Sequence, residues 1–414
     1  MDLQSIVDWR LCLGCGACAP VCPERRISLV DFPREGIRPV LGAGDCRDCV
    51  DCLKVCPAYE NDRRGANARQ GVIAELLPYC GPVLEIWEAH AVDPKVRFMG
   101  SSGGLITALS LYCLEVKEMK GVLHTAAHPK VPWQNQTRLS HSRSELLEAT
   151  GSRYAPASVC DGLSRVENAP GPCLVVGQPS EITALRKAQI LRPSLDEKVG
   201  LAISFFCAGS PSTQATLDYL KKHDVVPDRV EGIRYRGMGW PGHFAVKLKG
   251  NPELVRLGSY AESWSFLQAY RPFSVHLSPD GTGEDADITC GDPWYRKIDP
   301  DEPGSSLVMI RTELGRRVFA DALKRGYVAA KRLGVDKVLR SQGNLFEKRG
   351  AIWGRLLVLK LLGIPIPRLV GFSLFRNWLR LSFMDKSRSV FGTARRVIMR
   401  RLYRRLQLGK EMKS

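Results

Sequence analysis

The chain has 414 residues, 44% of them hydrophobic, so it can form two or three domains with a sizeable core, and an intrinsically disordered protein is excluded. Its 14 cysteines come without an N-terminal apolar stretch long enough for a secretory signal, which argues against a disulfide framework and indicates a reducing, cytoplasmic location. The formal net charge of the chain is +17. The residues after position 346 contain 17 Lys and Arg but only three acidic residues, so the basic character belongs to the tail.

Two cysteine runs occupy the first 60 residues, which we expect to form a ferredoxin-type domain (1–60). Each run has the spacing Cys-x2-Cys-x2-Cys-x3-Cys-Pro, which is typical of bacterial ferredoxins, where the fourth cysteine of one run binds the cluster of the other. We therefore expect two [4Fe-4S] clusters, one held by Cys12, Cys15, Cys18 and Cys56, the other by Cys46, Cys49, Cys52 and Cys22. A pair of zinc sites is the alternative, but such sites usually show separated C-x2-C pairs.

The polar residues 60–69 are interpreted as a linker. Residues 71–165 and 166–340 are expected to be two parts of one body, because short apolar runs alternate with amphipathic stretches as they do in α/β proteins. The patterns predict strands at 121–127, 173–176 and 201–206, and helices at 103–118, 181–189 and 213–222. Anions often bind where a strand turns into a helix N-terminus.

Residues 98–317 resemble the beta-subunit family of deazaflavin (coenzyme F420) hydrogenases and dehydrogenases. The segments that carry this resemblance lie in family order at 101–109, 151–157, 175–186, 205–212, 235–242 and 286–294. Members of the family are flavoproteins that pass electrons between iron–sulfur clusters, FAD and a second acceptor. The resemblance implies an α+β or α/β fold, with a small ferredoxin-like module, a mixed α/β flavin-binding body and a basic, largely helical tail.

The resemblance also implies FAD, and the residues of two strand–helix turns suit it. A flavin dinucleotide needs backbone N–H groups for its pyrophosphate and a close approach of the backbone to its ring. A capped helix or a tight turn is the simpler interpretation of each residue taken alone. The candidate flavin-binding residues are Ser101, Ser102, Gly103, Gly104, Tyr154, Gly177, Gln178 and Ser180.

The chain departs from the family where a third cluster would be held. Ser180 stands where the family usually has cysteine, and Val275 and Ser278 stand where it has a C-x-x-C pair. Because valine cannot ligate iron and serine does so poorly, we expect no third cluster, and we expect Cys207 and Cys290 to be small buried hydrophobic residues. The flavin would then exchange electrons directly with the ferredoxin module.

The tail, residues 341–414, mixes arginine with large apolar residues. Arg355, Lys360 and Pro365 interrupt every apolar window of the roughly 20 residues that a membrane span needs. Arginine, Trp and Phe within the same turns are typical of helices lying at an anionic membrane surface, and their arginines are not expected in a protein core. We expect a peripheral position on the inner face of the membrane, with an acidic partner protein as the alternative and no nucleic acid.

These features together predict an iron–sulfur flavoprotein oxidoreductase that passes electrons between two [4Fe-4S] clusters, FAD and an unidentified two-electron substrate. Its partner would be an electron donor or acceptor protein, or a deazaflavin-type coenzyme. Two alternatives remain open: a non-catalytic subunit that delivers electrons to a partner enzyme, and a scaffold that keeps the ferredoxin module but binds no flavin. No pattern in the sequence identifies a catalytic residue or the substrate.

Overall fold

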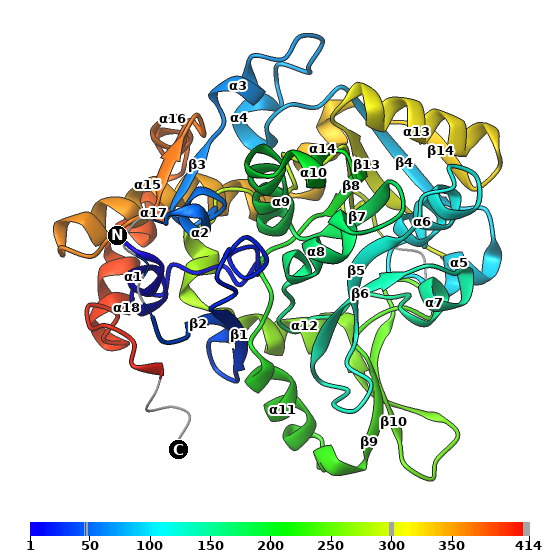
Figure 1. Ribbon diagram of the computed structural model, residues 1–414, viewed down its shortest axis with the longest axis horizontal. Coiled ribbons are helices and arrows are strands. Elements are labelled where there is room, and N and C mark those ends of the chain that lie inside the picture. Colours follow the sequence, from blue (N-terminus) through cyan, green and yellow to red (C-terminus); the bar gives the residue numbers. More distant parts are fainter. Residues whose placement is uncertain (45, 47–48, 298–301, 409–414) are drawn as a thin grey trace.

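An eight-stranded mixed sheet lies at the centre of the molecule (Figure 1). The computed structural model describes residues 1–44, 46, 49–297 and 302–408, so residues 409–414 of the expected tail lie outside it. Strands β5, β7, β8 and β12 run parallel in the middle, and antiparallel neighbours complete both edges. In sheet order the strands are β14 (Val328–Arg332), β4 (Glu85–Ala91), β13 (Ser306–Ile310), β12 (Ile288–Gly291), β8 (Val199–Phe205), β7 (Cys173–Gly177), β5 (Val122–Ala127) and β6 (Asn135–Ser140).

Helices cover both faces of this sheet. Leu174 and Val176 of β7 face the core beneath α6 (Leu105–Glu115) and α13 (Glu313–Lys324), whereas Val175 faces the core beneath α9 (Pro179–Leu191). This alternation follows from the two-residue period of a strand. Shorter helices flank the sheet: α4 (Leu77–Cys80), α5 (Pro94–Met99), α7 (Arg143–Glu148), α8 (Leu163–Glu167) and α10 (Pro193–Asp196).

The strands and helices predicted in the body are found in the structure, with one shift that matters for the site. The helix expected at 103–118 begins at Leu105, with Gly104 at its N-cap. Gly103 and Gly104 both have φ +65°, a left-handed backbone conformation that glycine adopts without steric cost. Ser102 therefore lies before the cap and does not cap the helix.

A second, smaller sheet projects from the body. It contains β9 (Val230–Arg234), β10 (His243–Leu248) and β11 (Leu254–Ser259), and it packs against α11 (Thr213–Lys222) and α12 (Tyr260–Leu267). Tyr219, Tyr235 and Phe244 are buried in its own core.

The N-terminal module has a helix, a hairpin and a short second helix. They are α1 (Leu3–Asp8), the antiparallel pair β1 (Ile27–Phe32) and β2 (Gly36–Leu41), and α2 (Asp51–Lys54). The segment 60–69, interpreted as a linker, is instead built into the fold as β3 (Glu60–Asp62) and α3 (Arg64–Asn67). Arg63 between them is 1% exposed and forms ion pairs with Asp280 (3.4 Å) and Asp285, so this polar segment is fixed to the body. The fold class predicted from the sequence is confirmed.

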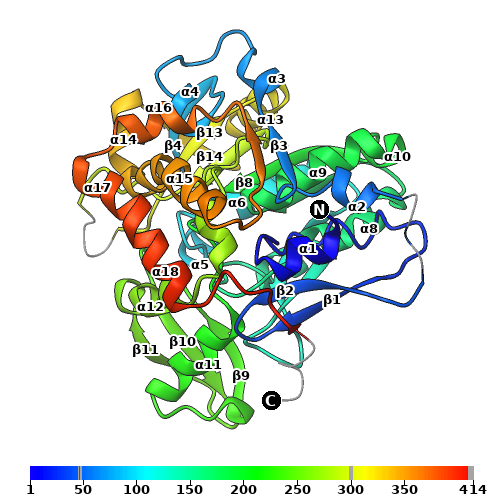
Figure 2. The same cartoon turned by 90° about the vertical axis from the view of Figure 1, so that its left-hand side faces the viewer.

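The tail is largely helical and packs back onto the rest of the chain (Figure 2). Val397 and Leu402 share a core with Ile6 and Leu11 of the ferredoxin module, and Leu406 N–H donates to Asp8 O at 2.8 Å. The tail strand β15 pairs in parallel with β3. The elements after the body are α14 (Val335–Ser341), α15 (Gly343–Leu361), β15 (Arg368–Val370), α16 (Leu374–Leu379), α17 (Phe383–Ser387), a π-helical turn (Arg388–Gly392) and α18 (Thr393–Met399).

One expectation for the tail is wrong: an arginine of this segment is buried in protein. Arg349 is 3% exposed and pairs with the fully buried Glu284, and its guanidinium also donates to Tyr79 O at 3.2 Å. The carboxylate offsets the cost of desolvating the guanidinium, so burial leaves no unpaired charge. Among the described residues, no helix combines the length and apolar character needed to cross a membrane.

Candidate redox site

The thiols of the N-terminal module form two groups. Electrostatic repulsion acts on Cys15 and Cys18 from Cys12 and Cys56, and on Cys52 from Cys49, Cys46 and Cys22; a weaker repulsion between Cys18 and Cys52 acts across the two groups. Burial is the main reason that the pKa values of Cys15 and Cys18 lie well above the usual value, and neighbouring thiolates raise them further. Each group thus takes three thiols from one run and the fourth from the other, which is the pattern of two-cluster bacterial ferredoxins.

The first group lines a small cavity in the module, the thiol cavity, with about 20 Å³ of space; Cys52 of the second group and apolar side chains complete its wall. The backbone N–H of Gly14 donates to Cys12 Sγ at 3.4 Å, a contact that stabilises a thiolate. Gly16 has φ +84°, and a Cβ there would lie 2.9 Å from Ser158 Cβ, so this turn packs directly on the body. Thiols in an apolar setting are the donor chemistry of an iron–sulfur cluster, although among the described residues no three potential ligands lie close enough together to hold a metal ion in this structure.

The second group lies at the surface. Cys46 and Cys49 are exposed, in contrast with the buried Cys18 and partly buried Cys12 of the first group. Arg26 Nη1 donates to Cys46 Sγ at 3.4 Å and brings a positive charge beside this group. An iron–sulfur cluster held here would be open to a partner.

A large cavity of about 640 Å³ lies in the body beside the ends of the parallel strands. This volume is within the range of pockets that hold drug-sized ligands and cofactors. Its wall includes the turn before α6, the turn between β7 and α9, the start of α12, and residues 340–345, where α14 ends and α15 begins. The N-terminus of α6 supplies the positive end of a helix dipole and backbone N–H groups without intrahelical partners to this side of the sheet, whereas the Gln178 N–H before α9 is already bound by Glu181.

The structure brings five of the eight candidate flavin-binding residues to this cavity and three elsewhere. The five that line it are Ser101, Ser102, Gly104, Tyr154 and Gln178. Gly103 instead packs on the chain at 304–305, where a Cβ would lie 2.8 Å from Ser305 Cα. Gly177 packs against Glu181 of α9, and Ser180 lines a different, smaller pocket.

Aromatic rings and a buried ion pair form a second wall, which the sequence analysis did not single out. Tyr260 stacks on Trp294 (5.8 Å between ring centroids), and Tyr154 contacts Trp264 (5.1 Å). Arg236 donates to both carboxylate oxygens of Asp292, at 2.7 and 2.6 Å, and its guanidinium lies 4.3 Å from the Tyr260 ring centroid. Burial lowers the pKa of Arg236, but the charge of Asp292 and its hydrogen bonds raise it by more, so the guanidinium stays charged.

Part of this wall could have been found from the sequence. Arg236 lies in segment 235–242, and Asp292 and Trp294 lie in segment 286–294, both of which carry the family resemblance. Tyr260 and Trp264 give no such signal, because one turn of helix with two aromatic residues is usual in a core. Planar rings beside a fixed cation and a helix N-terminus suit a planar, anionic cofactor, so the wall fits a flavin dinucleotide.

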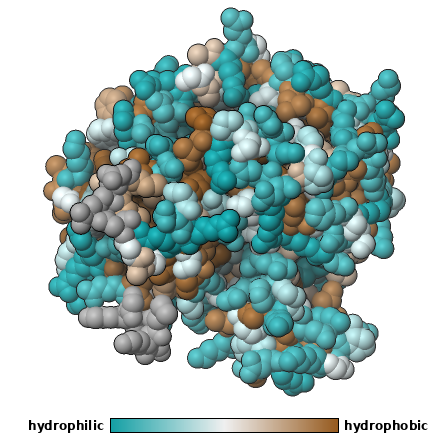
Figure 3. Space-filling model, viewed as in Figure 1, coloured by the Kyte–Doolittle hydropathy of each residue, from teal (hydrophilic) through white to brown (hydrophobic). Residues whose placement is uncertain are grey.

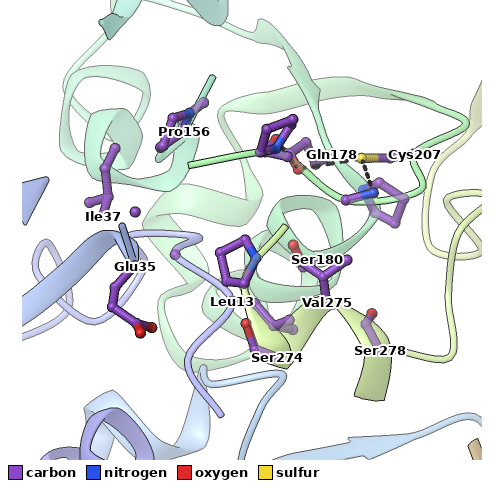
Figure 4. Close-up of a pocket in the computed structure, with 18 of the residues that line it drawn as sticks. Leu13, Glu35, Ile37, Pro156, Gln178, Ser180, Cys207, Ser274, Val275 and Ser278 are labelled. Atoms are coloured by element: carbon purple, nitrogen blue, oxygen red, sulfur yellow. Dashed lines mark hydrogen bonds between the residues drawn. The ribbon is translucent and has the colours of Figure 1, made fainter. Parts of the chain in front are cut away.

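The smaller pocket lies at the seam between the ferredoxin module, the body and the tail, and we call it the seam pocket (Figure 4). Four of the five positions discussed for a third cluster, Ser180, Cys207, Val275 and Ser278, line it, although they come from three separate parts of the chain. Cys207 Sγ accepts the N–H of Gly209 at 3.3 Å and lies 3.5 Å from Gln178 Oε1.

The residues at these four positions present one thiol, two hydroxyls and a valine. Val275 presses on the backbone of Gly209, where a Cβ would lie only 1.9 Å from its Cγ1. Cys290 does not line the seam pocket: it is 2% exposed in the core under α6 and borders the large cavity. Cys207 is partly exposed to the seam pocket, unlike the buried hydrophobic residue expected.

Comparison with known proteins gives matches to three family models. Residues 86–164 match the N-terminal region, and residues 172–335 the C terminus, of the coenzyme F420 hydrogenase/dehydrogenase beta subunit, and residues 11–59 match the 4Fe-4S dicluster domain. The chain is 26% identical to the coenzyme F420 hydrogenase subunit beta of Methanosarcina barkeri over 294 residues, which cover 66% of this chain and 94% of that protein.

Two further relatives extend this comparison. The coenzyme F420-dependent sulfite reductase of Methanocaldococcus jannaschii is 24% identical over 78% of this chain, which spans only 48% of that protein. A solved chain from the F420-reducing [NiFe] hydrogenase complex of Methanosarcina barkeri superposes with a TM-score of 0.55 at 25% identity. That match covers 70% of this chain and 97% of the other.

Proposed function

The chain belongs to the family of coenzyme F420 hydrogenase/dehydrogenase beta subunits, and from this premise we propose that it is an iron–sulfur flavoprotein oxidoreductase. In this proposal it passes electrons between two [4Fe-4S] clusters, FAD and a two-electron substrate. The clusters are held by the two thiol groups, Cys12, Cys15, Cys18 and Cys56 in one and Cys22, Cys46, Cys49 and Cys52 in the other.

The observation that carries this proposal is that the seam pocket shares lining residues with the thiol cavity on one side and with the large cavity on the other. Leu13 and Gly14 line both the thiol cavity and the seam pocket. Gln178 and Cys207 line both the seam pocket and the large cavity. The two outer cavities are therefore separated only by the seam pocket and the residues bordering it, which suits a chain that moves electrons between them.

FAD in the large cavity would supply the conversion between single electrons and electron pairs. Gly104 and the N-terminus of α6 support binding of its pyrophosphate, because backbone N–H groups and the helix dipole favour an anion there. Tyr154 and the ring wall would hold its planar part, and Arg236 would place a fixed positive charge beside it. The side chains at the four seam positions support direct exchange between the first cluster and the flavin, without a third cluster between them.

The surface-exposed second group supports an order for the electron route. Exposed Cys46 and Cys49 would meet a redox partner protein, and the buried first group would follow in the interior. The second acceptor at the large cavity would be a deazaflavin-type coenzyme or another planar two-electron carrier, in keeping with the relatives named for coenzyme F420.

The alternative, a non-catalytic electron-transfer subunit, has an observation of its own in its favour: the solved chain that this protein resembles is one chain of a hydrogenase complex.

Large apolar residues remain exposed on the tail, which supports a cytoplasmic location on the inner face of a membrane. Phe383 is 88% exposed, Leu361 76% and Phe391 72%. Arg376 and Arg380 at the neighbouring helix α16 are exposed as well, and hydrophobic and hydrophilic side chains are interspersed at that edge of the molecule (Figure 3). Insertion of the rings and attraction of arginines to anionic headgroups would act together.

Anaerobic purification followed by an absorption spectrum, flavin extraction and iron analysis tests the central proposal. We expect cluster absorbance together with a flavin that thin-layer chromatography identifies as FAD, and about eight irons per chain. Reduced coenzyme F420 and a panel of redox proteins then test the substrates. Cluster absorbance without extractable flavin would leave the scaffold alternative, and FAD without turnover of any acceptor would favour the electron-transfer subunit.

A further inference from the structure

Cations gather on the tail side of the seam pocket without carboxylate partners. Lys348 lines the pocket from α15, and Arg355 lies two turns further along the same helix. Arg271 lies just before the 3-10 turn η4 (Phe273–Leu277) that carries Val275, and Arg396 of α18 is close enough to repel both Arg271 and Arg355.

Their hydrogen bonds do not neutralise them. Lys348 Nζ and Arg271 Nη1 lie 3.5 and 2.9 Å from Ala208 O, and Arg355 Nη1 donates to His276 O at 2.7 Å. Within the described part of the chain, none of the four cations forms an ion pair with a carboxylate. Lys348, Arg271 and Arg355 contact backbone carbonyl oxygens, and Arg271 also lies over the Trp264 ring, but none of these contacts supplies a full negative charge.

Gathering these four cations costs free energy, and the cost is visible in the lowered pKa values of Lys348 and Arg355. Burial, together with the positive charges of Arg271 and Arg355, lowers the pKa of Lys348 to about 8. Burial and the cations Arg396 and Arg271 lower the pKa of Arg355 to about 10. Groups of cations under mutual repulsion are stabilised by a bound anion, which removes both the repulsion and part of the desolvation cost.

A further cation reaches the same pocket from the ferredoxin module. Arg38 lines it and is only 3% exposed, yet its Nε and Nη2 atoms have no hydrogen-bond partner. Leaving buried donors of a charged group unpaired costs on the order of 1–3 kcal/mol or more. Arg38, with its unpaired nitrogens, and Lys348 therefore line the same pocket from two distant parts of the chain.

The two carboxylates that line the pocket are already engaged. Glu35 lies 3.8 Å from Arg10 Nε and 3.9 Å from Arg38 Nη2, too far from the latter for a hydrogen bond. Asp280 accepts the backbone N–H groups of residues 282, 283 and 284 and pairs with Arg63. Neither carboxylate forms an ion pair with Lys348, and the attraction to Asp280 is too weak to offset the effect of burial and of the neighbouring cations on the lysine's pKa.

We propose that the seam pocket binds a phosphate-type oxyanion, either free or as the phosphate group of a larger ligand. Lys348 and Arg38 would contact its oxygens from two sides, with the hydroxyls of Ser180 and Ser278 as further donors. The pocket has about 50 Å³ of space for water centres, several times what one water needs, so a tetrahedral oxyanion fits. The proposal concerns this pocket alone and stands whether or not FAD occupies the large cavity.

Isothermal titration calorimetry of the full chain, purified anaerobically with its clusters and kept free of phosphate, tests this site. Inorganic phosphate and ribose 5-phosphate are titrated separately into wild type, Lys348→Met and the matched control Lys360→Met, which changes an exposed lysine of the same helix. We expect saturable binding of phosphate, at least tenfold weaker in Lys348→Met and unchanged in Lys360→Met. Binding of both probes would indicate a phosphorylated ligand, and binding of inorganic phosphate alone a free ion.

A second measurement guards against a folding defect in the variant. Bound phosphate should raise the melting temperature of wild type and Lys360→Met, and should raise that of Lys348→Met much less, with all three proteins equally folded in its absence. Three results would overturn the proposal: no saturable binding of either probe, equal affinity in Lys348→Met and wild type, or an iron content of about twelve per chain, which would mean that the pocket holds a cluster.

Discussion

The crossed assignment of the cluster ligands can be tested by counting irons in pairs of cysteine variants. Cys56 belongs to the second run, but its thiol is grouped with Cys12 and Cys15, while Cys22 is grouped with Cys52. Replacing any one thiol of a group with alanine should destroy that group's cluster and spare the other. Each single variant should therefore keep about four of about eight irons.

Double variants separate crossed from uncrossed assignments without ambiguity. Cys12→Ala combined with Cys56→Ala removes two thiols from one group, so about four irons should remain, as in either single variant. Cys12→Ala combined with Cys22→Ala removes one thiol from each group, so the protein should contain almost no iron. If each run held its own cluster, these two results would be exchanged.

The assay is iron and acid-labile sulfide per chain after anaerobic purification, with EPR of the reduced protein to count the remaining clusters. Cys113→Ala, a buried cysteine in the core under α6, is the matched control and should keep all irons. The surface position of Cys46 and Cys49 adds a second readout. A variant left with only the exposed cluster should lose iron to a chelator faster than one left with the buried cluster. Four irons in Cys12→Ala/Cys22→Ala would refute the crossed assignment.

Three further predictions concern the body and the tail. Tyr154→Ala should lower FAD occupancy at least tenfold while the iron content stays unchanged. The control Tyr403→Ala, on the tail surface, should alter neither quantity. Equal FAD occupancy in both variants would place the flavin elsewhere. Arg349→Met strands the buried Glu284 carboxylate and should cost about 3–5 kcal/mol, which for one cooperative unit of this length lowers the melting temperature by about 3–6 °C. Calorimetry against Arg388→Met, whose side chain is 72% exposed, checks this, and equal melting temperatures would contradict a buried pair. Phe383→Ser with Phe391→Ser should weaken co-sedimentation with anionic vesicles at least tenfold, since each ring contributes on the order of 1–3 kcal/mol when it leaves water. The control is Ile190→Ser, an 85% exposed residue of α9, and wild-type protein that stays in the supernatant at low salt would exclude the membrane.

Local structure in the body was predictable because its causes are local. The apolar run at 173–176 became β7, and the amphipathic stretch at 213–222 became α11, because hydrophobic periodicity acts over a few neighbouring residues. The start of α6 was placed two residues early, since the left-handed conformation of Gly103 and Gly104 depends on how the turn packs against residues 304–305. The linker interpretation of residues 60–69 and the expectation that tail arginines are not buried were both wrong. The carboxylate partners of Arg63 and Arg349 lie more than 60 residues away in the sequence, so the polar pattern around each arginine does not reveal them.

What the sequence determined by itself is the chemistry available at each position: eight thiols in two ferredoxin runs, and serine or valine at three positions where the family resemblance leads us to expect cysteine. Ligand chemistry depends on residue type and short spacing, and both are written in the chain. Only the tertiary structure decided that Ser180, Cys207, Val275 and Ser278 line one pocket, that Lys348 and Arg38 reach it from opposite ends of the chain, and that rings from α12 face the large cavity. These contacts follow from how the sheet, the ferredoxin module and the tail pack on one another, and packing between distant segments leaves no periodic trace in the sequence.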